Sequence, residues 1–203
     1  PLEVLGMYQP LAAGGARIRP GAVRGVMAAD GQVLLLRSTR TERVLTPATA
    51  FLATHGMVEV MRSGTGRGGQ ALLPAGLVVA GKTGTTDDAR DSWFAGYSAN
   101  HLAVAWIGRD DNRPTPLSGA SGALRLWADF MGRLPQVSLP EAAPAGIEWA
   151  WLTADGRQRT AEGCAGARYL PLVAGTVPEA VTACGVAGEA VEGVRGFFRR
   201  LFR

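Results

Sequence analysis

Apolar residues recur at helical spacing in three segments of the chain, which predicts three helices. The expected helices cover 2–13, 46–62 and 119–133. Thr46 suits the N-cap of the second helix, and Pro47 suits its first turn. Leu124, Trp127 and Met131 stand three and four residues apart, so the third helix has one apolar face.

Short continuous apolar runs predict strands between these helices. The runs cover 77–80, 93–97 and 102–107. A turn at Ser98-Ala99-Asn100 separates the last two runs, so these strands should form an antiparallel pair. Asp30-Gly31 stands between two further apolar runs and predicts a hairpin over 22–37 with a two-residue turn. The glycine-rich segment 63–69 is expected to be a flexible loop.

The pattern changes after residue 135, which predicts three regions. They are a main domain over 1–135, a loop-rich extension over 136–188 and a tail over 189–203. Prolines interrupt the extension, and both cysteines lie in it. In the tail, Val194 and Phe198 belong to an apolar stripe and Arg195 and Arg199 to a basic one. Such a tail suits an anionic membrane surface or a protein partner, and a frayed basic terminus is the alternative.

Composition supports a folded domain, since 47% of the residues are hydrophobic and 19% are charged. No run of 18 or more apolar residues is present, so no segment is expected to span a bilayer. The net charge of +4 is too small for a nucleic-acid-binding surface. The chain starts at Pro1, inside an expected helix and without an initiating Met, so we expect it to be a piece of a longer protein.

Two cysteines, Cys164 and Cys184, leave two possibilities open. A disulfide between them would stabilise the fold by roughly 3 kcal/mol and would require an oxidising compartment. The alternative is two buried free thiols. Neither cysteine has a second cysteine or a histidine at metal-binding spacing, so no metal site is expected.

The densest chemical signal is the segment from Gly76 to Thr83, which matches the P-loop pattern G-x-x-x-x-G-K-[ST]. The four intervening residues are apolar, which favours a strand over a phosphate-binding loop. We therefore expect Lys82-Thr83-Gly84-Thr85-Thr86 to lie at a strand end. One lysine and several hydroxyls so close together could bind an anion or a carboxylate, and Gly84 would let a ligand approach the backbone. An ordinary exposed strand end is the alternative.

Longer motifs around this strand are more specific. The order GKTGTT, DSWFAGY and LAVAWIGRDDNRPTPLSGASGA resembles the transpeptidase domain of the class A penicillin-binding proteins. The preceding EVLGMYQPLAAGGARIRPGAVRGVMAADGQVL and MRSGTGRG segments are similar to that family as well. The cysteine-containing extension and the GVRGFFRRLFR tail resemble the 1b type. The resemblance implies an α/β (α+β) fold, with helices packed on a mostly antiparallel sheet as in serine β-lactamases, incomplete in this chain.

The resemblance also implies roles for individual residues. Lys82 would hold the polar network around a serine nucleophile. Thr83 and Thr85 would bind the carboxylate of a D-Ala-D-Ala stem peptide or of a β-lactam, with Gly84 and Thr86 beside them. The Thr85 N–H would be one of two oxyanion donors. The implied activity is that of a peptidoglycan D,D-transpeptidase without a cofactor, on the periplasmic side of a bacterial inner membrane.

One part of the family's pattern is missing from this chain. None of the seven serines is followed three residues later by lysine, because Lys82 is the only lysine. Ser98-Ala99-Asn100 follows Lys-Thr-Gly, in the wrong order for the second serine motif. We expect Ser-x-x-Lys before Pro1, in an upstream part of the same protein, with a glycosyltransferase domain further upstream. This chain alone should be inactive. The alternative function is a non-catalytic carboxylate-binding or interaction module.

Overall fold

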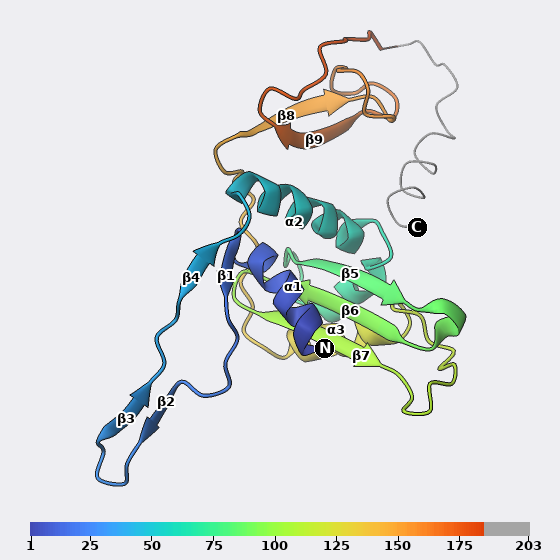
Figure 1. Ribbon diagram of the computed structural model, residues 1–203. Helices are drawn as coiled ribbons and strands as arrows, with labels where there is room; N and C mark the ends of the chain where they lie inside the picture. The colour runs from blue at the N-terminus through green and yellow to red at the C-terminus, as the bar shows by residue number, and fades with distance from the viewer. Residues whose placement is uncertain (185–203) are drawn as a thin grey trace. The chain divides into compact units, whose positions relative to one another are not determined.

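A computed structural model describes residues 1–184 of the chain, in two units (Figure 1). The helices are α1 (Leu2–Ala12), α2 (Pro47–Arg62) and α3 (Ala123–Gly132), with the short 3-10 helices η1 (Arg67–Leu72) and η2 (Asp87–Ala89). The strands are β1 (Ala16–Ile18), β2 (Gly25–Met27), β3 (Val33–Leu36), β4 (Thr41–Arg43), β5 (Ala80–Thr85), β6 (Ser92–Tyr97), β7 (Leu102–Ile107), β8 (Ile147–Leu152) and β9 (Arg168–Val173). The predicted tail over 189–203 lies outside the described residues.

The first unit ends at Ala143, eight residues beyond the boundary expected after residue 135. Hydrogen bonds explain the difference. The Leu139 N–H donates to the Val78 carbonyl at 3.0 Å, and the Ser138 hydroxyl accepts from the Val78 N–H at 3.1 Å. These bonds fasten the segment after α3 to the chain that leads into β5.

An antiparallel sheet in the order β5–β6–β7 forms the centre of this unit. Phe94 of β6 pairs with Thr83 of β5 on one side and with Ala105 of β7 on the other. The predicted antiparallel pair of β6 and β7 is confirmed. The first predicted strand was placed too early, because β5 begins at Ala80 and the apolar residues 77–79 precede it.

Helices cover both faces of the sheet. On one face, the rings of Phe94 and Trp127 of α3 lie 4.8 Å apart, centroid to centroid, and both residues are fully buried. The buried Ser92 hydroxyl accepts from the Ala123 N–H at 2.8 Å and fixes the start of α3 on β6. On the other face, the Tyr97 hydroxyl bonds the Thr54 hydroxyl of α2 at 2.7 Å. Burial raises the pKa of Tyr97 to about 12.

The predicted helices are confirmed, with boundaries within a few residues. Thr46 caps α2 by accepting a hydrogen bond from the Thr49 N–H at 3.1 Å, as a threonine before a helix-starting proline should. The expected flexible loop over 63–69 is wrong in part. Residues from Arg67 onward form η1, which contacts α2 and α3.

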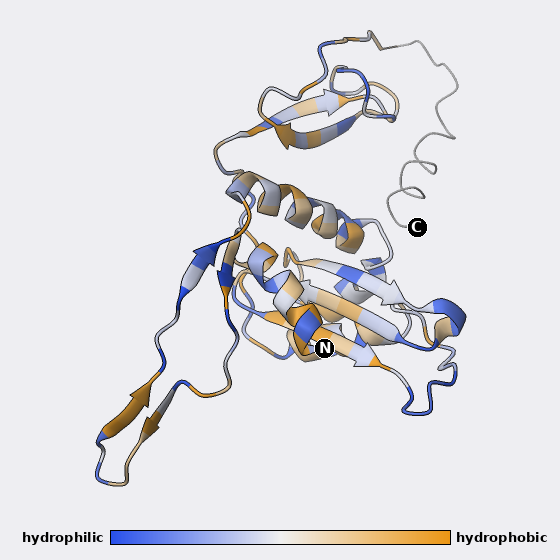
Figure 2. Ribbon diagram, viewed as in Figure 1, coloured by the Kyte–Doolittle hydropathy of each residue, from blue (hydrophilic) through white to orange (hydrophobic). Residues whose placement is uncertain are grey.

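A two-stranded arm joins α1 to α2. Strand β1 pairs with β4, and further along the arm β2 pairs with β3, both antiparallel. The predicted hairpin is therefore confirmed, although the turn from Ala28 to Gln32 is wider than two residues. Strands β2 and β3 are exposed along their whole length, and Figure 2 shows them as mostly hydrophobic.

The second unit is less loop-rich than expected, because β8 and β9 form an antiparallel pair. Pro171 inside β9 interrupts its sequence pattern, which is why the strand was missed. The Tyr169 ring lies 5.1 Å from both Trp149 and Trp151, centroid to centroid. Cys164 and Cys184 form a disulfide, which decides between the two possibilities left open by the sequence. Within residues 1–184, no helix has the length and apolar character needed to cross a membrane.

Replacing Trp127 with alanine tests the importance of the contact between α3 and the sheet. We expect the free energy of unfolding of the first unit to fall by about 3–5 kcal/mol, because a large buried ring is removed. Urea denaturation followed by circular dichroism measures the change. Leu126→Ala is the control, since Leu126 lies on the same helix with 51% of its surface exposed, and it should cost less than about 0.5 kcal/mol. Equal losses in the two variants would contradict this description of the core.

Candidate active site

The Lys-Thr-Gly segment lies at the end of β5, as the sequence predicts. Gly81 and Lys82 are within the strand, and the chain turns back into β6 through the short helix η2. A phosphate-binding loop would run from Lys82 directly into a full helix. The P-loop interpretation is therefore excluded by the local backbone.

Alternation along β5 separates the functional side chains onto two faces. Lys82 pairs with Ala95, and Gly84 with Trp93, on the face that α1 covers. Thr83 pairs with Phe94, on the face that α3 covers. Lys82 and Gly84 therefore lie on one face of the sheet, and Thr83 lies on the other.

Lys82 lines a small cavity of about 280 Å³ between β5, β6 and α1. Val4 and Tyr8 of α1 form its other side. The Lys82 ammonium donates a 2.7 Å hydrogen bond to the carbonyl of Thr83. Partial burial lowers the pKa of Lys82 below its ordinary value of 10.5, and burial raises the pKa of Tyr8. The cavity therefore favours the neutral amine more than water does.

The hydroxyls of Thr83 and Thr85 are held by two loops distant in sequence. Thr83 Oγ1 lies 2.7 Å from Thr65 Oγ1, in the loop after α2. Thr85 Oγ1 accepts a 2.8 Å hydrogen bond from the Gly119 N–H, in the loop before α3. A hydroxyl that accepts such a bond can still donate its own proton, so Thr85 keeps a donor for a ligand.

Thr65 and Gly119 were missed as individual site residues, although both lie in segments that resemble the family. A steric constraint explains why position 119 is a glycine. A Cβ at this position would lie 2.6 Å from the Gly84 carbonyl oxygen and 2.9 Å from the Gly84 N. Only glycine lets this loop approach β5 so closely.

Strand β5 has one unpaired edge in the part of the chain that the structure describes. In an antiparallel strand, the N–H and C=O of one residue point to the same edge, and those of the next residue point to the opposite edge. The Thr86 N–H donates to the Asp91 carbonyl, on the paired side, and the Thr83 carbonyl accepts from Lys82. By this alternation the N–H of Thr85 points to the unpaired edge.

Thr86 is occupied in closing the loop between β5 and β6. Its hydroxyl accepts from the Asp91 N–H at 2.8 Å and donates to the Asp91 carboxylate at 3.1 Å. The other carboxylate oxygen of Asp91 accepts from Trp106 Nε1 at 2.9 Å. Thr86 therefore shapes the end of the site, while the hydroxyls of Thr83 and Thr85 are held beside the strand.

Other candidate constellations have structural roles. The Ser98 hydroxyl donates to Asn100 Oδ1 at 3.0 Å and accepts from the His101 N–H at 3.2 Å, which stabilises the turn between β6 and β7. The region 1–184 contains no group of three or more His, Cys, Asp or Glu side chains that could hold a metal ion.

Comparison with known proteins agrees with this geometry. The penicillin binding protein transpeptidase domain family matches residues 1–118, more than half of the chain. The chain belongs to this family. The resemblance found in the sequence is thereby confirmed, and so is the α/β fold with helices on an antiparallel sheet.

Relatives of this penicillin-binding-protein segment are found among both sequences and solved structures. Penicillin-binding protein 1B of Vibrio cholerae is 41% identical over 149 residues, which cover 72% of this chain and 19% of the relative. Penicillin-binding protein 1A of Haemophilus influenzae superposes with a TM-score of 0.79 at 21% identity, covering 90% of this chain and 33% of that one. A ceftriaxone acyl-enzyme complex of penicillin-binding protein A from M. tuberculosis superposes with a TM-score of 0.53 at 21% identity. The match covers 66% of this chain and 32% of that one. The chain spans about a fifth of the length of the Vibrio cholerae protein.

Titration of Lys82 tests the cavity directly, because this penicillin-binding-protein segment has one lysine. Lysine labelled with ¹³C at Cε should give one resonance, with a titration midpoint below 10.5 in the folded chain. The unfolded state then binds more protons than the folded state between the two pKa values, so stability should rise with pH across that interval. NMR measures the midpoint, and the urea-unfolded chain serves as the reference.

Tyr8→Ala is the matched variant for this titration. Loss of the Tyr8 ring opens the cavity to water, so the midpoint should move back toward 10.5. A midpoint at or above 10.5 in the folded wild-type chain would contradict the burial of Lys82.

Proposed function

We propose that this chain forms one wall of the active site of a peptidoglycan D,D-transpeptidase. The observation that carries the proposal is the end of β5, where a lysine, two supported hydroxyls and an outward backbone N–H stand together at an unpaired edge. Membership of the transpeptidase family supports it. The proposed substrates are stem peptides that end in D-Ala-D-Ala, and β-lactams would react at the same site.

The threonine hydroxyls are the proposed receptor for the substrate's terminal carboxylate. Thr85 accepts from Gly119 and so keeps its O–H to donate, while the Thr65 hydroxyl shares a hydrogen bond with the hydroxyl of Thr83. A hydrogen bond to a charged acceptor contributes about 1.5–3 kcal/mol. The two hydroxyls would fix the end of the stem peptide along β5, and Gly84 would leave room for it beside the strand.

The backbone N–H of Thr85 is the proposed donor to the oxyanion. When a serine oxygen attacks the penultimate D-Ala carbonyl, negative charge develops on the carbonyl oxygen. A donor fixed in a hydrogen-bonded sheet needs no reorganisation as this charge appears, and losing one such donor costs about 2.7–4 kcal/mol. The pairing of β5 with β6 would hold this N–H in place.

Lys82 would serve the polar network around the nucleophile. Its ammonium lies in a partly buried cavity, where a positive charge acts more strongly on neighbouring groups than it does in water. It would stabilise the charge of the incoming carboxylate and of the groups around the serine. The covalent step is assigned to a serine outside this chain.

The overall reaction is an acyl transfer that needs no cofactor. The serine oxygen forms an ester with the penultimate D-Ala, its proton passes to a neighbouring base, and the terminal D-Ala leaves with a proton on its amine. An acceptor amine then attacks the ester and releases the serine. We place Ser-x-x-Lys on an upstream part of the same protein, with a glycosyltransferase beyond it. The disulfide suits the periplasmic side of a bacterial inner membrane.

Fluorescent-penicillin labelling tests this proposal on the full gene product that carries the chain. Thr85→Val keeps the backbone N–H but removes the hydroxyl, so the second-order acylation rate should fall by about 10- to 150-fold. Thr85→Ser restores the hydroxyl and should stay within about threefold of wild type. Labelling is read on a denaturing gel over time.

The 203-residue chain alone is the second arm of this experiment. It should take up no covalent label, because its lysine does not follow any serine at the required spacing. Label on the short chain would place the nucleophile among its seven serines and contradict the assignment. Absence of label on the full product would favour the non-catalytic alternative.

A further inference from the structure

The outer hairpin of the arm, β2 and β3, presents apolar side chains to solvent on both faces. Successive residues of a strand point to opposite faces, so Val33 and Leu35 lie on one face and Leu34 and Leu36 on the other. Leu34 is 60% exposed and Leu36 is 78% exposed. Each strand of this hairpin also has one edge without a strand partner within residues 1–184. Isolated two-stranded hairpins are marginally stable in water, so this one needs a covering surface.

The end of the hairpin is polar, which argues against insertion into lipid. Asp30 lies at the turn and accepts a hydrogen bond from the Gln32 N–H at 3.0 Å. A carboxylate at the tip would enter the hydrocarbon first, at high cost. The arm also contains no Trp, Tyr or Phe between residues 16 and 44, the residues that favour membrane interfaces. The arm therefore has an apolar hairpin with a polar turn at its end and arginines along its length. This pattern fits docking to a protein surface better than insertion into lipid.

The arm concentrates positive charge. Residues 16–44 contain six arginines, Asp30 and Glu42, which gives +4. The whole chain also carries a net charge of +4, so the charges of the residues outside the arm sum to zero. A field this localised would attract an acidic partner.

Several of these arginines have no carboxylate partner. Arg17 pairs with Glu42 at 3.8 Å, and Arg37 donates to the backbone carbonyls of Arg19 and Pro20. Within residues 1–184, no ion pair or hydrogen bond engages the guanidinium groups of Arg19, Arg24 or Arg40. In contrast, Arg62 pairs with Glu59 within α2, and Arg133, directly after α3, pairs with Asp129 of that helix.

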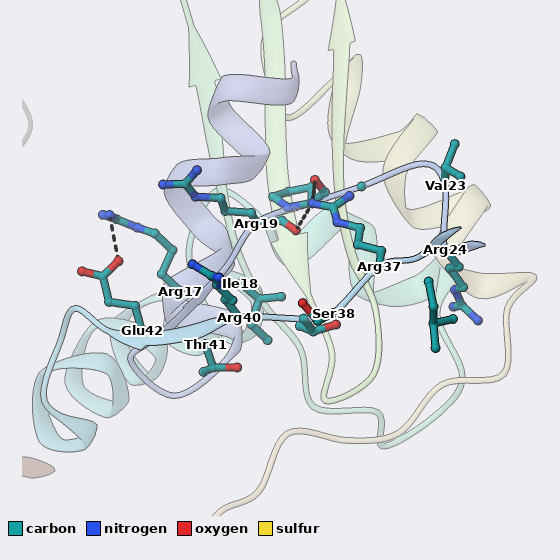
Figure 3. Close-up of a pocket in the computed structure, with 14 residues that line it drawn as sticks. Arg17, Ile18, Arg19, Val23, Arg24, Arg37, Ser38, Arg40, Thr41 and Glu42 are labelled. Atoms are coloured by element: carbon teal, nitrogen blue, oxygen red, sulfur yellow. Dashed lines mark hydrogen bonds and ion pairs between the residues drawn. The ribbon is translucent and has the colours of Figure 1, made fainter. Parts of the chain in front are cut away.

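The unpaired arginines border an open cavity of about 960 Å³ where the two strands of the arm separate (Figure 3). The register of β1 and β4 pairs Ile18 with Thr41, so Arg19 and Arg40 follow on the same face of the ribbon. Figure 3 shows their guanidinium groups on the same side as that of Arg17. Positive charges that line one cavity repel one another, and an anion bound between them would relieve this repulsion.

We propose that the arm, residues 16–44, is a docking surface for an acidic protein segment. Apolar side chains of the partner cover β2 and β3, and its Asp or Glu side chains pair with Arg19, Arg24 and Arg40. The partner adds hydrogen bonds along a free edge of the hairpin, as an extra strand does. This surface is separate from β5, so the inference does not depend on the proposed transpeptidase activity.

Site-specific photocrosslinking in the producing cell tests the proposal on the full gene product. Benzoylphenylalanine at Leu36 should give one protein adduct, and mass spectrometry should locate it in a segment rich in Asp and Glu. The triple variant R19Q/R24Q/R40Q should lower the adduct yield about tenfold, equivalent to about 1.4 kcal/mol of binding. The probe at Leu126, an exposed leucine of α3, should not give this adduct.

The charge control is R62Q/R125Q/R133Q, which removes three exposed arginines outside the arm and should leave the yield within about twofold. Circular dichroism shows that each variant is folded, and penicillin labelling of the same samples reports β5 independently. A lipid adduct, no adduct, an adduct to a neutral or basic segment, or equal yields in the two triple variants would each overturn the proposal.

Discussion

The pairing of β5 with β6 is the constraint on which the candidate site depends. It fixes which side of the strand each residue of the Lys-Thr-Gly motif faces, and which backbone groups reach the open edge. Phe94, packed on Trp127, anchors β6 to α3. The core contact therefore helps to fix the position of the Thr85 N–H, through the pairing of β6 with β5.

Two loops complete what the strand alone cannot provide. Thr65 and Gly119 come from positions 18 and 34 residues away from their partners in β5, and each fixes one hydroxyl. On the opposite face, α1 covers Lys82 and removes part of its hydration. The sheet thus separates the hydroxyl donors on one face from the partly desolvated Lys82 on the other.

Elements whose residues carry a regular local pattern could be predicted from the sequence. Strands β6 and β7 were predicted well because each is a short continuous apolar run. Helix α3 was predicted well because its apolar residues recur at helical spacing and form its buried face. The start of β5 was misjudged because Val78 is equally apolar but bonds to Ser138 and Leu139 instead of to a strand. Strand β9 was missed because proline interrupts it. Pairings such as Thr83 with Thr65 depend on the tertiary fold and leave no periodic signal.

The most direct test of the account is a crystal structure of the full gene product acylated by a penicillin. The account predicts the acyl carbonyl oxygen within 2.7–3.1 Å of the Thr85 N, as in an oxyanion hole. It also predicts the penicillin carboxylate within hydrogen-bonding distance of the Thr83 and Thr85 hydroxyls. An acyl group bound away from the open edge of β5, or a carboxylate held by other residues, would contradict it.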